Sequence, residues 1–93
     1  MRGDILARTN RVDEAAAAFN EEIRLYPHDR QTYANLAVVY ALTGSRVKAN
    51  ETMERLVRAN PDPASYQLAV TTFEQIGDAA DAAAWRARGH ASR

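Results

Sequence analysis

Apolar residues recur every three or four positions along most of the chain, and no segment alternates apolar and polar residues with a period of two. This spacing is typical of amphipathic helices, so the pattern predicts an all-α fold. Short connections between the segments predict that consecutive helices pack antiparallel, as hairpins. Six helices are predicted, over Arg2–Arg8, Val12–Leu25, Arg30–Leu42, Arg46–Ala59, Pro63–Ile76 and Ala79–Arg88.

Residues at the predicted helix ends support these boundaries. Gly44 and Gly77 follow the third and fifth helices, where a left-handed backbone conformation often ends a helix. Pro63 stands at a first helical position, which proline tolerates because that N–H has no helical partner. Gly89 and the polar tail are expected to fray. Aspartates precede the third, fifth and sixth helices as predicted N-caps, namely Asp29, Asp62 and Asp78.

The apolar pattern repeats itself along the chain. Ala15, Phe19 and Pro27 each precede a similar residue by 34 positions, namely Ala49, Met53 and Pro61. A second set repeats after 33 positions: Tyr33, Leu36, Ala37, Tyr40, Gly44 and Ala49 are echoed by Tyr66, Ala69, Val70, Phe73, Gly77 and Ala82. A fixed period of this length indicates a solenoid, in which each unit buries its apolar face against the next. We expect one domain, residues 1–93, made of a partial repeat 1–29, a repeat 30–62 and a terminal repeat 63–93.

The middle unit carries a specific resemblance. It runs through Tyr33, Leu36, Ala37, Tyr40, Gly44, Ala49, Met53, Leu56 and Pro61. These residue types at these gaps resemble the tetratricopeptide repeat, and the segment from Arg11 to Ala15 resembles the opening of that family's second helix. The resemblance implies a superhelix of αα-hairpins with about two and a half repeats. It departs at Glu22, where the family has a small residue, and at Arg86, where it has a large apolar one.

Small residues are expected where the two helices of a hairpin cross closely, and large ones between hairpins. The small positions are Ala15, Ala37, Ala49 and Ala82, and the large ones are Tyr40, Phe19, Met53 and Phe73. Trp85, the single tryptophan, is expected to cover the end of the core. The first unit lacks the front of its first helix. This predicts either a piece of a longer array, which we favour, or a half-helix completed by another chain.

Composition excludes several classes of function. Twelve basic and 12 acidic residues give a formal net charge of zero, which argues against the clustered basic excess of nucleic-acid binding. The absence of cysteine excludes disulfides and thiolate metal sites. No apolar run approaches the roughly 20 residues of a membrane span. His28 and His90 have no catalytic or metal-binding motif around them, so we expect no cofactor and no metal.

The resemblance also implies where a partner would bind. In this family the first helix of each hairpin lines a concave groove, which here implies Asp4, Arg8, Gln31, Asn35, Val38, Leu42, Gln67, Leu68, Thr71 and Gln75, together with Ala34 and Ala64. Asn35 is equally compatible with bridging a peptide backbone through its amide and with a solvated surface position. Family members that clamp a terminal carboxylate use basic residues where this chain has Ala64 and Leu68. We therefore expect a partner segment with apolar side chains, not an acidic tail.

These features predict a protein-interaction module that binds a peptide or protein surface and carries out no chemistry. Open edges at the terminal repeats also predict a possible homodimer. The alternative is a small all-helical enzyme, such as a dimer similar to chorismate mutase. That chemistry needs several cations around a dianionic substrate, and Lys48 is the only lysine.

Overall fold

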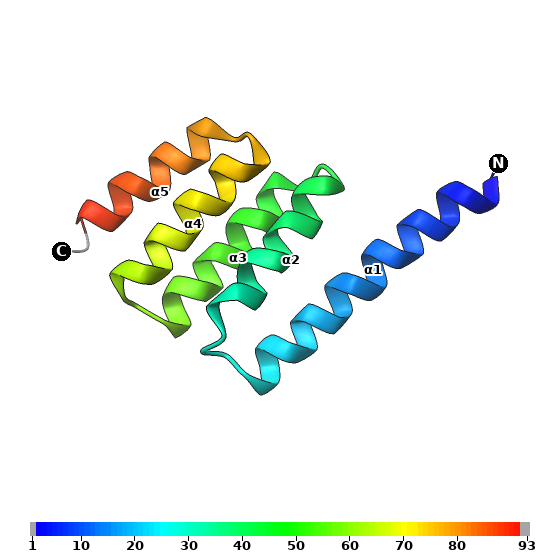
Figure 1. The fold of residues 1–93 in the computed structure, drawn as a ribbon, viewed down its shortest axis with the longest axis horizontal. Coiled ribbons are helices and arrows are strands. Elements are labelled where there is room, and N and C mark those ends of the chain that lie inside the picture. The colour runs from blue at the N-terminus through cyan, green and yellow to red at the C-terminus, as the bar shows by residue number, and fades with distance from the viewer. Residues whose placement is uncertain (1, 92–93) are drawn as a thin grey trace.

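The computed structural model describes residues 2–91, with side chains described for residues 11–91. This part of the chain contains five helices and no strand. The helices are α1 (Arg2–Leu25), α2 (Arg30–Leu42), α3 (Arg46–Ala59), α4 (Pro63–Ile76) and α5 (Ala79–Ala91), and they follow one another across a flat array (Figure 1). The prediction of an all-helical chain is confirmed.

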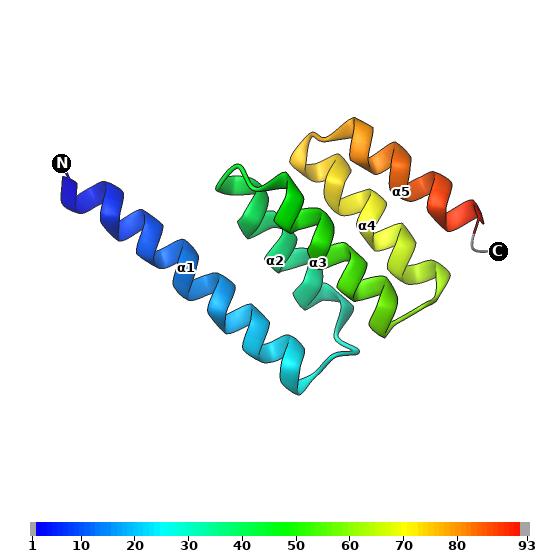
Figure 2. The ribbon, with the colours of Figure 1, turned by 180° about the vertical axis from the view of Figure 1, so that it is seen from behind.

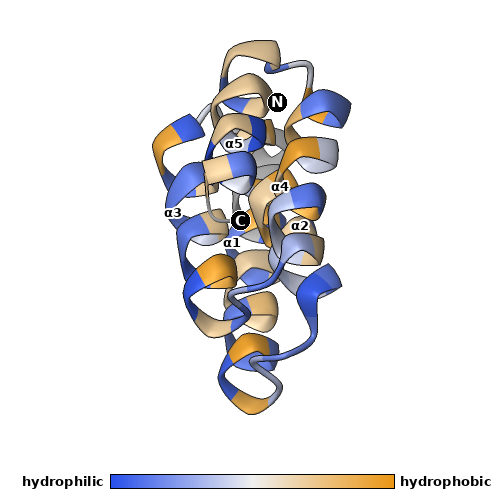
Figure 3. Ribbon diagram, turned by 90° about the vertical axis from the view of Figure 1, so that its left-hand side faces the viewer, coloured by the Kyte–Doolittle hydropathy of each residue, from blue (hydrophilic) through white to orange (hydrophobic). Residues whose placement is uncertain are grey.

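The helices pack as neighbouring pairs. α2 lies against α3 and α4 lies against α5, each pair antiparallel, and α1 packs on α2 (Figure 1). The two hairpins meet chiefly through α2 and α4. Viewed end-on, α2 and α4 form one layer and α3 and α5 the other (Figure 3). The side chains between the layers make one apolar core, which runs from Ile23 to Trp85.

Two glycine turns close the hairpins in the same way. Gly44 has a φ of 79° and Gly77 a φ of 89°, which is the left-handed region predicted for both. After each glycine the next N–H returns to the helix: Ser45 donates to the Tyr40 carbonyl and Asp78 to the Phe73 carbonyl, both at 2.9 Å. The 33-residue repeat of the sequence is thus matched by the same turn geometry at both sites.

The predicted break between the helices Arg2–Arg8 and Val12–Leu25 is wrong. Residues 2–25 form a single helix of 24 residues, so the first two predicted helices are one and the described residues contain five helices in place of six. Asn10 occupies the position that Gly44 holds 34 residues later, and a residue with a β-carbon enters the left-handed conformation at a cost. No glycine or proline lies between Arg8 and Val12 to interrupt the helix.

The predicted caps differ in detail. The Asp62 carboxylate accepts from the Ser65 N–H at 2.9 Å, and the Asp78 carboxylate accepts from the Asp81 N–H at 3.1 Å. Asp29 stands at the N-cap of α2, but its side chain makes no capping hydrogen bond; its carbonyl accepts from the Thr32 N–H. The predicted side-chain cap at Asp29 is therefore wrong, although the boundary is right.

The core follows the predicted register. Ala37 and Ala49 have no exposed surface and Ala82 has 2%, which fits their expected places at close helix crossings. Met53 and Phe73 are equally buried, whereas Phe19, Tyr40 and Ala15 are half-buried. Trp85 is 2% exposed, as expected for a residue of the core.

The C-terminal helix is longer than predicted. α5 continues through Gly89 to Ala91, so the expected fraying at Gly89 is wrong. A β-carbon at Gly89 would lie 3.1 Å from the Tyr66 β-carbon, which shows how closely α5 approaches α4 there. The polar Arg86 that departs from the family pattern pairs with Glu74 at 2.9 Å.

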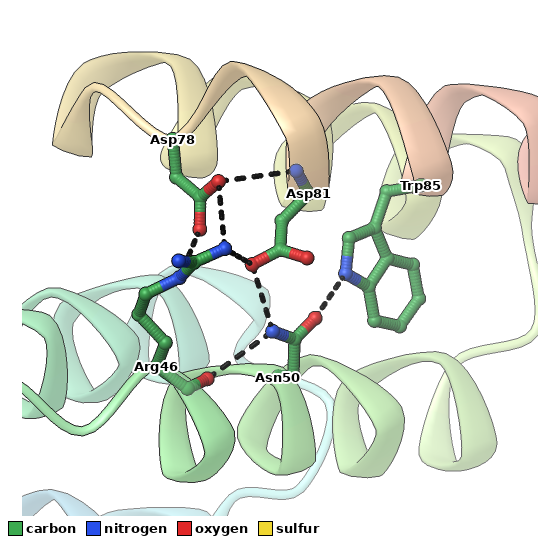
Figure 4. A network of polar contacts seen from close by, with 5 residues as sticks. All are labelled: Arg46, Asn50, Asp78, Asp81 and Trp85. Carbon is green, nitrogen blue, oxygen red and sulfur yellow. Dashed lines mark hydrogen bonds and ion pairs between the residues drawn. The ribbon is translucent and has the colours of Figure 1, made fainter.

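A polar network ties α3 to α5 (Figure 4). The Trp85 indole N–H donates to the Asn50 side-chain oxygen at 2.9 Å, and the Asn50 amide donates to Asp81 at 3.1 Å. Arg46 contacts Asp78 at 2.9 Å and Asp81 at 3.3 Å. The pKa of Asp81 is lowered, first by a hydrogen bond with Asp78 and then by those from Asn50 and Arg46, while burial opposes the shift. The network therefore holds consecutive hairpins together through oriented polar groups.

The loops on the opposite edge repeat this arrangement. Arg30 at the start of α2 forms an ion pair with Asp62 at the start of α4, and its guanidinium donates to the Ser65 hydroxyl at 3.2 Å. The hydrogen bond from Arg30, followed by the Ser65 N–H, lowers the pKa of Asp62. The α2–α3 and α4–α5 hairpins are thus joined to each other at both ends.

Candidate functional site

A groove runs between α2 and α4. It contains a hollow of about 190 Å³ and, towards the C-terminal ends of the two helices, a second hollow of about 280 Å³. The two hollows share Val38 and Gln75, so they adjoin each other, and together they are here named the α2–α4 groove. The first hollow is lined by Gln31, Ala34, Asn35, Val38, Leu68, Thr71, Thr72 and Gln75, and the second by Val38, Ala41, Leu42, Gln75 and Ile76.

The spacing of residues along each helix explains why these side chains converge. On α2 the lining residues Gln31, Asn35, Val38 and Leu42 lie three or four positions apart, which places them on one face. On α4 the same spacing links Leu68, Thr71 and Gln75. Because α2 and α4 contact each other, the two faces border one groove.

The structure brings together eight of the twelve residues expected at a partner site. Gln31, Ala34, Asn35, Val38, Leu42, Leu68, Thr71 and Gln75 all line the α2–α4 groove, and Ala64 does not. Gln67 does not: it lines a separate hollow of about 140 Å³ between α4 and α5, beside Tyr66 and Trp85. Asp4 and Arg8 lie in the first part of α1, and their side chains are outside the described residues. Whether the eight bind a partner stays a prediction.

The sequence prediction missed three residues of the lining. These residues are Ala41, Thr72 and Ile76. Ala41 and Thr72 each lie next to a predicted groove residue in the sequence, and Ile76 is the last residue of α4. Thr72 is only 2% exposed and its hydroxyl donates to the Leu68 carbonyl at 2.7 Å, so it lies at the floor. The period alone could have found it, because Thr72 follows Leu68 by four residues.

The groove is polar at its rim but carries no charge. None of the residues that line its two hollows is ionisable, although a quarter of the chain is Asp, Glu, Lys or Arg. The Gln31 amide donates to the Asn35 oxygen at 3.2 Å, and the Thr71 hydroxyl donates to the Gln67 carbonyl at 3.0 Å. Asn35 and Gln75 are exposed, so their amide groups are accessible to a bound molecule. Amides offer both donors and acceptors, as a peptide backbone does.

The histidines lie elsewhere. His28 is exposed in the loop after α1, and its ring Nδ1 lies 2.9 Å from the Asn60 side-chain oxygen. The sequence did not predict this hydrogen bond. His90 is exposed on α5. Across the described residues, histidine and carboxylate side chains form no group of three or more that could hold a metal ion.

Within the described part of the chain, no helix is long and apolar enough to cross a membrane. In comparisons with known proteins, the chain matches no family model and no curated protein sequence. The geometry of the groove, with the repeat in the sequence, is therefore the basis for a functional assignment.

Proposed function

We propose that this chain is a short solenoid of the tetratricopeptide-repeat type, and that it binds an extended segment of a partner protein in the α2–α4 groove. Recognition depends on helices that are already in place, and no bond is made or broken. The observation that carries the proposal is the convergence of eight residues, expected at a partner site from the sequence, on one uncharged groove.

The repeat geometry supports the solenoid. Gly44 and Gly77 make the same turn 33 residues apart, and Ala49 and Ala82 are both buried at equivalent crossings. Solenoids present extended surfaces to their partners because each unit contacts only its neighbours. The α2 and α4 layer is such a surface, formed by the first helix of each complete hairpin (Figure 3).

The lining indicates the chemistry of the ligand. Val38, Leu42 and Leu68 supply apolar surface, and Gln31, Asn35 and Gln75 supply amides at the rim. Amide side chains pair with the N–H and C=O groups of an extended backbone, while the apolar residues receive side chains. A groove without cations has nothing to neutralise a carboxylate, so the ligand is an extended peptide with apolar side chains and no acidic tail.

A peptide selection tests this proposal. A random-sequence library displayed on phage is selected against the wild-type chain, and the affinity of the enriched peptides is then measured for variants. Val38→Glu and Leu68→Glu should weaken binding at least about tenfold, because a buried carboxylate against apolar peptide surface is costly. Asn35→Ala should weaken it less, by roughly the value of one hydrogen bond. Val47→Glu is the matched control, since Val47 is 71% exposed on α3, outside the groove.

Undiminished affinity in all three groove variants would contradict the proposal. Enrichment of peptides with acidic tails would contradict the proposed ligand chemistry, although the groove could still be the binding site.

The arrangement of the arginines favours binding over a helical enzyme. An enzyme for a dianionic substrate needs cations that converge on a cavity. Arg24, Arg30, Arg46, Arg86 and Arg88 instead form ion pairs with carboxylates at the surface. Of the residues that line the hollows between α2, α4 and α5, one is an arginine, Arg86, and its partner is Glu74.

A further inference from the structure

A large hollow lies between α1, the end of α2 and the start of α3. Its volume is about 550 Å³. Val12 and Ala16 on α1 face Tyr40 and Leu42 on α2 across it, and Leu42 is 80% exposed. Asp13, Thr43 and Lys48 complete the lining. This α1–α2 hollow therefore combines an apolar interior with one acidic and one basic side chain.

The internal repeat shows what such a hollow accommodates. In the internal repeat, α3 is the counterpart of α1 one unit later in the chain, and α4 is the counterpart of α2. The corresponding space there is filled, because α2 packs against both α3 and α4. By this equivalence, the α1–α2 hollow is the place of a helix that would be the counterpart of α2. Such a helix would pack against α1 and α2, just as α2 packs against α3 and α4.

The segment with the matching register is residues 2–9. Gly3 and Leu6 precede Ala37 and Tyr40 by 34 residues, so the segment repeats the pattern of the second half of α2. It carries both signs of charge in Asp4 and two arginines, and the hollow offers Asp13 and Lys48. Opposite charges are thus available on both sides of the contact.

The segment cannot reach the hollow of its own chain. Residues 2–25 form one unbroken helix, which diverges from α2 towards its N-terminal end (Figures 1 and 2). Turning back would need a left-handed residue near Asn10, as at Gly44 and Gly77, and the helix has none there. A straight helix that carries its first turns away from the molecule can instead deliver them to another molecule.

We infer that two copies of this chain exchange their N-terminal segments, so that residues 2–9 of each copy occupy the α1–α2 hollow of the other. The exchange is symmetric, because each copy contributes one segment and one hollow. The formal net charge of zero removes long-range repulsion between the copies. The interface shares Leu42 with the α2–α4 groove and leaves Gln31, Asn35 and Leu68 outside the contact.

Cysteine crosslinking tests which segment fills the hollow. The chain has no cysteine, so each introduced thiol is unique. One protein carries Leu6→Cys and the other Thr43→Cys, which lines the hollow; the two are mixed, unfolded, refolded together and mildly oxidised. As the control, Arg58→Cys, which is exposed on α3, replaces Thr43→Cys. We expect the disulfide-linked heterodimer to form about tenfold faster with Thr43→Cys than with the control, because binding of the segment in the hollow raises the effective concentration of the two thiols.

Absence of the heterodimer, or a yield equal to that of the Arg58→Cys control, would overturn the exchange. A double variant with Leu6→Cys and Thr43→Cys should give crosslinked dimers. If it gives a crosslinked monomer instead, the segment folds back within its own chain and the inference is wrong.

Sedimentation gives an independent measurement. Val12 lines the hollow, whereas Val47 is exposed on α3 outside it, so the same substitution can be compared at both sites. Val12→Lys should raise the dissociation constant of the dimer about tenfold or more, because it places an ammonium group in an apolar contact. Val47→Lys should leave it unchanged. The inference would be overturned if the wild-type chain sediments as a monomer at high concentration, or if the two variants have equal effects. Neither result would bear on the proposed peptide binding in the α2–α4 groove.

Discussion

Replacing Trp85 with phenylalanine isolates the polar link between α3 and α5. Trp85 is 2% exposed, and its indole N–H donates to the Asn50 side-chain oxygen at 2.9 Å. Phenylalanine keeps an aromatic ring beside Tyr66 but removes the donor, so the half-buried Asn50 oxygen loses its partner. An unsatisfied buried polar group costs about 1–3 kcal/mol. The smaller ring adds about 1 kcal/mol of lost apolar burial, which gives a total of about 2–4 kcal/mol.

The assay is urea unfolding followed by far-ultraviolet circular dichroism, because Trp85 is the single tryptophan and its replacement removes the fluorescence probe. Asn50→Ala and the double variant complete a double-mutant cycle. Since the two side chains share one hydrogen bond, the cycle should show a coupling free energy of about 1 kcal/mol. A loss below about 0.5 kcal/mol for Trp85→Phe, with no coupling to Asn50, would refute this account of the link.

Three further predictions concern the turns, the core and acid stability. Gly44→Ala and Gly77→Ala should each lower the free energy of unfolding by about 1–2 kcal/mol, because both glycines have positive φ; urea melts showing no loss at either would contradict the shared turn. Ala49→Leu should destabilise by about 1–3 kcal/mol through overpacking, since Ala49 has no exposed surface; an unchanged midpoint would show a looser core. Because the pKa of Asp81 is lowered in the folded state, the unfolded chain takes up the proton at a higher pH than the folded chain does. The stability that this carboxyl contributes is therefore complete above its usual pKa of 3.8 and is lost as the pH falls through its pKa in the folded state. Stability measured against pH should therefore fall less steeply on the acid side for Asp81→Asn than for wild type, and parallel curves would contradict the shift.

Local signals in the sequence were sufficient for most of the helices. Gly44 and Gly77 ended α2 and α4 where a left-handed residue was expected, and Pro63 began α4. These boundaries depend on a few residues with strong backbone preferences, which the sequence displays directly. The predicted boundary near Asn10 failed because asparagine does not by itself end a helix, and no glycine or proline lies between Arg8 and Val12.

The groove was predictable for a similar reason, within limits. Helical periodicity places Asn35 with Val38 and Leu68 with Thr71, and the repeat predicts that the two helices pack side by side. Gln67 lies in a different hollow because α4 packs on α5, with Tyr66 against Trp85. The 33-residue period of the sequence does not predict this packing. The polar network at Asn50 was also missed, because its partners lie 31 and 35 residues away in the sequence.

Nuclear magnetic resonance offers the most direct test of binding in the α2–α4 groove. The isotope-labelled chain is titrated with a peptide selected from the random-sequence library, and amide and side-chain shifts are followed. Our account predicts that the largest changes occur at Gln31, Asn35, Val38, Leu68 and Thr71, with saturation at one peptide per groove. Changes confined to the outer faces of α3 and α5 would contradict it.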